Sequence, residues 1–67
     1  MSNPAAPSTQ LQRRVRDLVE RTSTRRAARS LDLSDATIAR ICAGLPVHAA
    51  TLTHAEQRLA AAEGAAA

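Results

Sequence analysis

Arginine is the residue type in this sequence that is best suited to bind another molecule. All nine basic residues are arginines, and seven of them fall between residues 11 and 29: Arg13, Arg14, Arg16, Arg21, Arg25, Arg26 and Arg29. The guanidinium group is always charged, and its planar fork of donors matches phosphate and the edge of guanine. Only Asp17 and Glu20 oppose these arginines, so this segment carries a net charge of +5, whereas residues 30–67 carry −2. A basic half on a short chain predicts a polyanionic partner.

Metal binding and catalysis have weaker support. Cys42, His48 and His54 are of metal-ligand types, but three such residues without a fourth, spread over a helix end and a loop, make a poor zinc site. No nucleophile–base pair and no glycine-rich phosphate loop is present. We therefore expect no metal, no cofactor and no enzymatic activity. The single cysteine, the absence of 18 consecutive apolar residues and the lack of a signal peptide predict a soluble cytoplasmic protein without a membrane partner.

The spacing of apolar residues predicts a small all-α domain of four or five short helices and no sheet. A capping box of Thr9 and Gln12 opens the first helix, and the cap-forming residues 22–24 end it. Its inward stripe is Leu11, Val15, Leu18 and Val19. Residues 1–8 and 64–67 are expected to flank the domain of residues 9–63 as a flexible arm and a flexible tail.

Residues 23–44 predict two short helices joined by a tight turn. Ala27 and Ala28 are small where the second helix must cross the first. Asp32 occupies the turn position that needs positive φ, at a cost of about 1 kcal/mol. Leu33 then plugs the turn into the core, and Ser34 caps the second helix. The inward residues of that helix are Ile38, Ile41, Cys42 and Leu45, and it is ended by Gly44 and Pro46.

The last helix has alternative starting points. His48 or Thr51 caps an early start, and Thr53 with Glu56 forms a capping box for a later one. Its inward face is predicted to be Leu52, Ala55, Leu59 and Ala62. The chain has only twelve Leu, Ile and Val residues and no aromatic ones, so a partner is expected to contribute to its stability. A homodimer interface is expected on the last helix, at Leu52, Glu56, Leu59 and Ala60.

The segment of residues 23–44, STRRAARSLDLSDATIARICAG, resembles the helix-turn-helix of the Cro/cI (Xre-type) phage-repressor family. The positions that match the family pattern in register are Ala28, Leu31, Leu33, Ser34, Thr37, Ile38, Ile41 and Gly44. The resemblance extends over most of residues 10–59 and departs at Asp32, where glycine is usual. It implies a repressor-like fold whose second motif helix enters the major groove of DNA.

The resemblance places base-reading residues on that helix, at Asp35, Ala36, Ala39 and Arg40. Thr37, at the tip of the helix, can meet a thymine methyl group, Arg40 can fork onto guanine, and Asp35 can accept from cytosine. Dipole stabilisation is the alternative for Asp35, and a phosphate contact is the alternative for Arg40. The expected phosphate contacts are Ser23, Thr24, Arg25, Arg13, Arg14, Arg26 and Arg29.

These features together predict a sequence-specific regulator of transcription that binds double-stranded DNA. The simplest form is a small homodimeric autorepressor of phage or mobile-element type, which binds an inverted repeat, occludes a promoter and needs no small-molecule effector. The alternative is a helical protein-binding module, such as a phage-encoded factor that docks on a host protein. RNA binding is a weaker alternative, because the chain has no aromatic residues to stack on single-stranded bases.

Overall fold

Four helices make up most of the computed structural model, which describes residues 4–66, with the backbone alone for residues 63–66. The order of elements is β1 (Pro4–Ala5), α1 (Thr9–Arg21), α2 (Thr24–Leu31), α3 (Asp35–Ala43), β2 (Val47–His48) and α4 (Ala49–Ala66). The predicted all-α class is confirmed in its coarse form, because the helices dominate and the sheet is minor. Among residues 4–66, no helix is both long enough and apolar enough to cross a bilayer.

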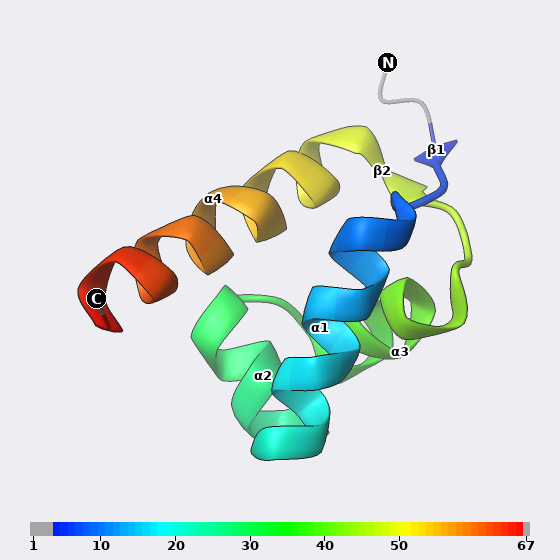
Figure 1. The fold of residues 1–67 in the computed structure, drawn as a ribbon. Helices are drawn as coiled ribbons and strands as arrows, with labels where there is room; N and C mark the ends of the chain where they lie inside the picture. Colours follow the sequence, from blue (N-terminus) through cyan, green and yellow to red (C-terminus); the bar gives the residue numbers. More distant parts are fainter. Residues whose placement is uncertain (1–3, 67) are drawn as a thin grey trace.

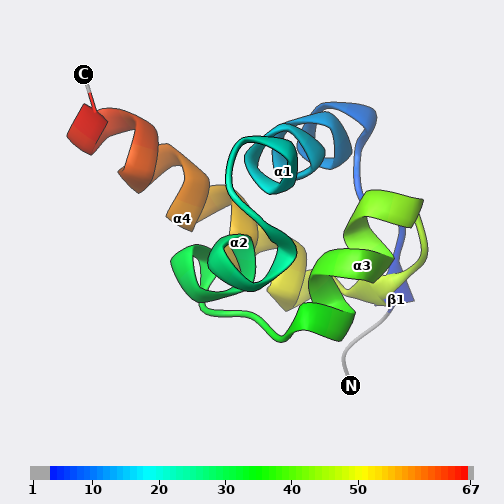
Figure 2. The same cartoon turned by 90° about the horizontal axis from the view of Figure 1, so that it is seen from below.

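Helices α1, α2 and α3 pack together, and α4 crosses this group with its C-terminal end projecting beyond it (Figures 1 and 2). Helix α2 is central, since it contacts α1, α3 and α4. The projecting end of α4 helps to give the molecule its elongated dimensions of 35 × 20 × 20 Å. Helix α3 lies at the opposite end from that projection (Figure 2).

The core is built from the apolar stripes of all four helices. Its buried members are Leu11, Val15, Ala27, Ala28, Leu31, Ile38, Ile41, Ala55 and Leu59. The small side chains of Ala27 and Ala28 are buried where α2 meets the other helices, as the sequence predicts. Leu18, Val19, Leu33 and Leu52 are partly buried and pack against this cluster. The predicted stripes of α1, α2 and the first turns of α3 are therefore confirmed.

The prediction of no sheet is wrong in one detail. Strands β1 and β2 pair in antiparallel fashion, with Pro4 opposite His48 and Ala5 opposite Val47. Proline has no N–H to donate and fixes φ near an extended value, so a two-residue edge pairing suits it. Residues 4–5 of the predicted flexible arm are thus fixed beside the segment that links α3 to α4, and residues 1–3 lie outside the described part of the chain.

The start of α1 also differs from its predicted form. Ser8, not Thr9, is the N-cap, and its Oγ accepts a hydrogen bond from the N–H of Leu11 at 3.1 Å. Ser8 has the extended backbone that a cap requires. Gln12 does not reach back to the start of the helix, because its side chain is bonded to the carbonyl of Cys42 instead.

Helix α4 begins at Ala49, directly after His48, which was one of the cap candidates for an early start. Thr53 does not cap it, because the Thr53 hydroxyl donates to the carbonyl of Ala49 inside the helix, at 3.3 Å. The helix continues to Ala66, through most of the predicted tail, in keeping with the helix propensity of alanine. Residue 67 lies outside the described residues. Ala62 is exposed, which contradicts its predicted inward position.

Candidate nucleic-acid interface

The turn between α2 and α3 sets the direction of α3. Asp32 has φ 55° and ψ 48°, the left-handed conformation predicted for it. The N–H of Leu33 donates to the carbonyl of Ala28 at 2.8 Å, and the N–H of Asp32 donates to that of Arg29 at 3.3 Å. These two bonds close the end of α2 in the pattern of a Schellman motif, whose αL residue is most often glycine. Leu33 is partly buried against the core, so the turn is anchored as the sequence predicts.

Ser34 begins α3 as its N-cap. The Ser34 Oγ accepts from the N–H of Thr37 at 3.1 Å and also lies 2.9 Å from the Thr37 hydroxyl oxygen. At the other end, Gly44 has φ 76°, and the N–H of Leu45 donates to the carbonyl of Arg40 at 2.9 Å. The cap and the terminating glycine were both predicted. Leu45 was predicted to face inward, but it is 48% exposed, because the left-handed turn at Gly44 takes the chain away from the helical period.

The two faces of α3 differ sharply in burial. Ile38 and Ile41 are 0% exposed and fix the inner face to the core. The exposed residues of the helix are Asp35, Ala36, Ala39, Arg40 and Ala43. Thr37 is half-buried at the edge of this surface. The structure therefore brings four of the five candidate base-reading residues to one exposed surface, in which the side chains between Asp35 and Arg40 are small.

Arg40 is exposed and points along the surface toward the segment that follows α3. Its Nη1 donates a long hydrogen bond, 3.4 Å, to the carbonyl of Pro46. A shallow hollow of about 300 Å³ lies beside it, lined by Pro4, Thr37, Arg40, Pro46, Val47, His48 and Thr51. The pairing of β1 with β2 places Pro4 opposite His48, and both residues line this hollow.

The N-terminus of α2 forms a second exposed region. Ser23 is its N-cap, and the Ser23 Oγ accepts from the N–H of Arg26 at 3.1 Å. Thr24 and Arg25 are exposed in the first turn, as are Arg26 and Arg29 further along α2. Backbone N–H groups at a helix N-terminus, together with adjacent arginines, attract anions.

The arginines of α1 fall on two different sides of that helix. Arg13 is exposed and lines a surface hollow with Gln12 and Arg16, on the side where Gln12 reaches α3. Arg14 is half-buried on the other side and lines hollows with residues of α4. Arg13 and Arg14, both predicted to contact phosphate, are therefore directed to different sides of the molecule.

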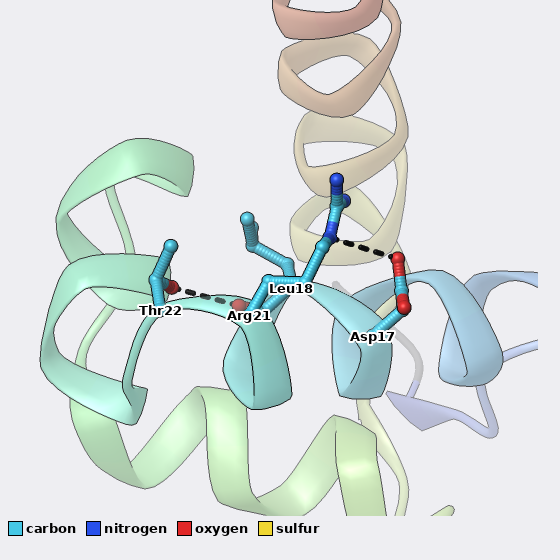
Figure 3. Close-up of polar contacts among 4 residues, drawn as sticks. All are labelled: Asp17, Leu18, Arg21 and Thr22. Atoms are coloured by element: carbon cyan, nitrogen blue, oxygen red, sulfur yellow. Dashed lines mark hydrogen bonds and ion pairs between the residues drawn. The ribbon is translucent and has the colours of Figure 1, made fainter.

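Two further arginines of α1, Arg21 and Arg16, interact with other residues of the chain. Arg21 Nε lies 3.0 Å from Asp17 Oδ2, and beside this pair the Thr22 hydroxyl donates to the carbonyl of Leu18 at 2.7 Å (Figure 3). Arg16 and Glu20 lie four residues apart on α1 but form no ion pair in the described part of the chain. Arg16 instead acts on the Cys42 thiol. Partial burial raises the pKa of that thiol, and the charge of Arg16 opposes the rise.

Sequence reasoning missed two contacts that join distant elements. Gln12 Nε2 donates to the carbonyl of Cys42 at 2.9 Å, which connects α1 to the C-terminal end of α3. Arg58 Nη2 donates to the carbonyl of Ser30 at 3.2 Å, which connects α4 to α2. Both join residues about 30 positions apart, so no local pattern in the sequence could have indicated them.

The predicted dimer interface does not form a single exposed surface. Leu59 is 5% exposed and belongs to the core of its own chain, and Leu52 is partly buried against that core. Glu56 and Ala60 are exposed. Leu52 and Leu59 lie on the apolar face of α4, and that face packs against the core of the same chain.

Among the side chains of residues 4–62, no three His, Cys, Asp or Glu residues lie close enough together to hold a metal ion. Comparison of the chain with protein-family models, with curated proteins and with solved structures gave no match. The features of the structure that bear on function are the exposed surface of α3, the N-terminus of α2 and the arginines around them.

Proposed function

We propose that this chain is a sequence-specific regulator of transcription that binds double-stranded DNA through a repressor-like helix-turn-helix, residues 23–44. In this proposal α3 lies in the major groove and the N-terminus of α2 lies against the phosphate backbone. The chain acts in the cytoplasm as a small homodimeric autorepressor of phage or mobile-element type, which occludes a promoter without an effector.

The observation that carries the proposal is the exposed surface of α3, whose opposite face is buried in the core through Ile38 and Ile41. Nine helical residues span about 13 Å, and a helix about 10–12 Å in diameter fits a major groove about 12 Å wide. Ala36 and Ala39 leave little bulk between the helix and the base edges. Arg40 supplies a guanidinium for guanine, and Asp35 supplies an acceptor for cytosine. The Thr37 hydroxyl is engaged with Ser34, which leaves Thr37 the role of an apolar contact with thymine.

Exposed hydroxyl-bearing and basic residues supply the phosphate contacts in this proposal. They are Ser23, Thr24, Arg25, Arg26 and Arg29 on α2 and its cap, with Arg13 on α1. Each phosphate neutralised contributes roughly 0.9 to the slope of log affinity against log salt. Arg14 is the least suited of the predicted set, because it is half-buried on the side that faces α4.

Selection of bound duplexes from a random pool tests the proposal. A homodimer is expected to yield an inverted repeat whose half-site centres lie about one helical turn, roughly 34 Å, apart on one face of the duplex. A single asymmetric motif would overturn the proposed homodimer but would still support sequence-specific DNA binding. A selected pool with no motif would overturn sequence-specific binding altogether.

A second candidate function is supported by a different surface. Ala60, Ala61 and Ala62 are exposed on the part of α4 that projects from the molecule (Figure 1). A helical protein-binding module would use such a surface. The Arg40→Ala variant separates the two functions, because it should weaken discrimination by a DNA reader and leave a protein binder that uses α4 unaffected.

A further inference from the structure

The amide of Gln12 lies against the C-terminal end of α3. Gln12 belongs to the first turn of α1, and its Nε2 donates to the carbonyl of Cys42 at 2.9 Å. The last carbonyls of a helix have no donor within the helix. The N–H of Leu45 donates to the carbonyl of Arg40, and the N–H of Gly44 donates to that of Ile41. The carbonyl of Cys42 accepts from Gln12.

Gly44 provides the space for this contact. A Cβ atom on residue 44 would lie 3.3 Å from Gln12 Nε2 and 3.5 Å from Gln12 Oε1. Glycine at this position therefore serves two purposes: it takes the φ of 76° that ends α3, and it lets the Gln12 amide lie close to the backbone. The Gln12 side chain is half-buried, so water competes with the hydrogen bond less than it would on an open surface.

The two ends of α3 are held by different means. At the N-terminal end, the turn at Asp32 and the Ser34 cap fix the backbone. At the C-terminal end, the Gln12 bond reaches the carbonyl of Cys42, only two residues beyond Arg40. A small tilt of this end would move the Arg40 guanidinium away from a given base edge while the buried isoleucines kept α3 folded.

We infer that Gln12 is a positioning residue for base readout: its hydrogen bond to Cys42 fixes the C-terminal end of α3 and so sets where Arg40 points. This inference rests on the proposed function, and it assigns to Gln12 no contact with DNA. Loss of the bond should lower discrimination between DNA sequences, whereas binding that depends on phosphate contacts should be kept, because the arginines of α2 are unaffected.

The test compares Gln12→Ala and Gln12→Glu with a matched control, Gln57→Ala, which removes an exposed glutamine from α4. The Gln12→Glu variant keeps the shape of the side chain but at neutral pH replaces the donor by an acceptor. For each protein, the dissociation constants are measured for a duplex taken from a random-pool selection and for a scrambled duplex, at one salt concentration. The negative charge that glutamate adds affects binding to both duplexes, so its general effect cancels in the ratio of the two dissociation constants. Thermal melting of the free protein reports on folding.

In both Gln12 variants, the ratio of the dissociation constant for the scrambled duplex to that for the selected duplex should fall about tenfold, as expected when one base contact is misplaced. The alanine variant should retain the wild-type affinity for the scrambled duplex. The control should keep the wild-type ratio. An unchanged ratio in Gln12→Ala would overturn the inference, and so would full discrimination in Gln12→Glu, because shape alone would then suffice. A parallel fall in both affinities of Gln12→Ala, together with a large fall in melting temperature, would make Gln12 merely structural. A wild-type ratio near one would overturn the proposed function itself, before any variant is compared.

Discussion

The left-handed conformation of Asp32 gives the sharpest prediction about stability. This conformation costs a residue with a Cβ roughly 1–2 kcal/mol, and the cost is smaller for aspartate than for most residues. Glycine pays nothing there, but it makes the unfolded chain more flexible, which costs about 0.4–1 kcal/mol. We therefore expect Asp32→Gly to stabilise the protein by about 0.5 kcal/mol and Asp32→Ala to destabilise it by about 1 kcal/mol.

Ala39→Gly is the matched control, because Ala39 is exposed in the middle of α3, where the backbone is helical. There glycine should be the worse residue, by about 1 kcal/mol. The preference between glycine and alanine thus reverses between positions 32 and 39. Thermal or urea unfolding of the variants measures this reversal, since 1 kcal/mol shifts the melting temperature of a domain this small by about 4–8 °C.

The result that would refute this reasoning is a preference of the same sign at both positions. If alanine were at least as stabilising as glycine at position 32, that residue would not be left-handed in solution. The turn that directs α3 would then differ from the one described, and the orientation of Arg40 would lose its support.

The remaining predictions concern DNA binding, capping and the thiol. The Arg40→Ala variant should lose roughly 1–3 kcal/mol of discrimination at one base pair, with little change in the salt dependence of binding. The Arg13→Ala variant should instead reduce the slope of log affinity against log salt by roughly 0.9 and leave the preferred sequence unchanged. Fluorescence titrations at several salt concentrations distinguish these outcomes. Ser34→Ala removes the cap of α3 and should cost about 1 kcal/mol in urea unfolding, and wild-type stability in this variant would contradict the cap. Because burial raises the pKa of the Cys42 thiol, the folded state keeps its proton to higher pH than the unfolded state does, so stability should fall as pH rises through the ordinary thiol range. Unfolding curves across that range should show this fall in the wild type and not in Cys42→Ser; equal pH dependence in both would exclude the thiol as its cause.

The residues that define α2, its turn and α3 could be predicted because their signals are local. The positive φ of Asp32, the Ser34 cap and the end of α3 at Gly44 each follow from the chemistry of one residue in its immediate context. The burial of Ile38 and Ile41 follows from helical periodicity, and so the exposure of Arg40 could be predicted as well.

Some of the features that were missed depend on contacts between distant segments. Others depend on which of two nearby residues takes a given role. Gln12 was expected to cap its own helix, but Ser8 already fills that role, and the glutamine side chain reaches Cys42. Pro4 was expected in a mobile arm, but it pairs with His48, 44 positions away. Leu59 has the spacing of a core residue and is buried in its own chain, so its side chain is not available for the dimer interface that was also predicted for it.

Amide chemical shifts recorded during titration with a selected duplex test the central claim most directly. The shifts should change most along Asp35–Arg40 of α3 and at Ser23–Arg25 before and within α2, and residues 60–62 of α4 should change little. Changes confined to α4, or spread evenly over the arginines without a maximum on α3, would contradict the claim that the exposed surface of α3 reads the base pairs.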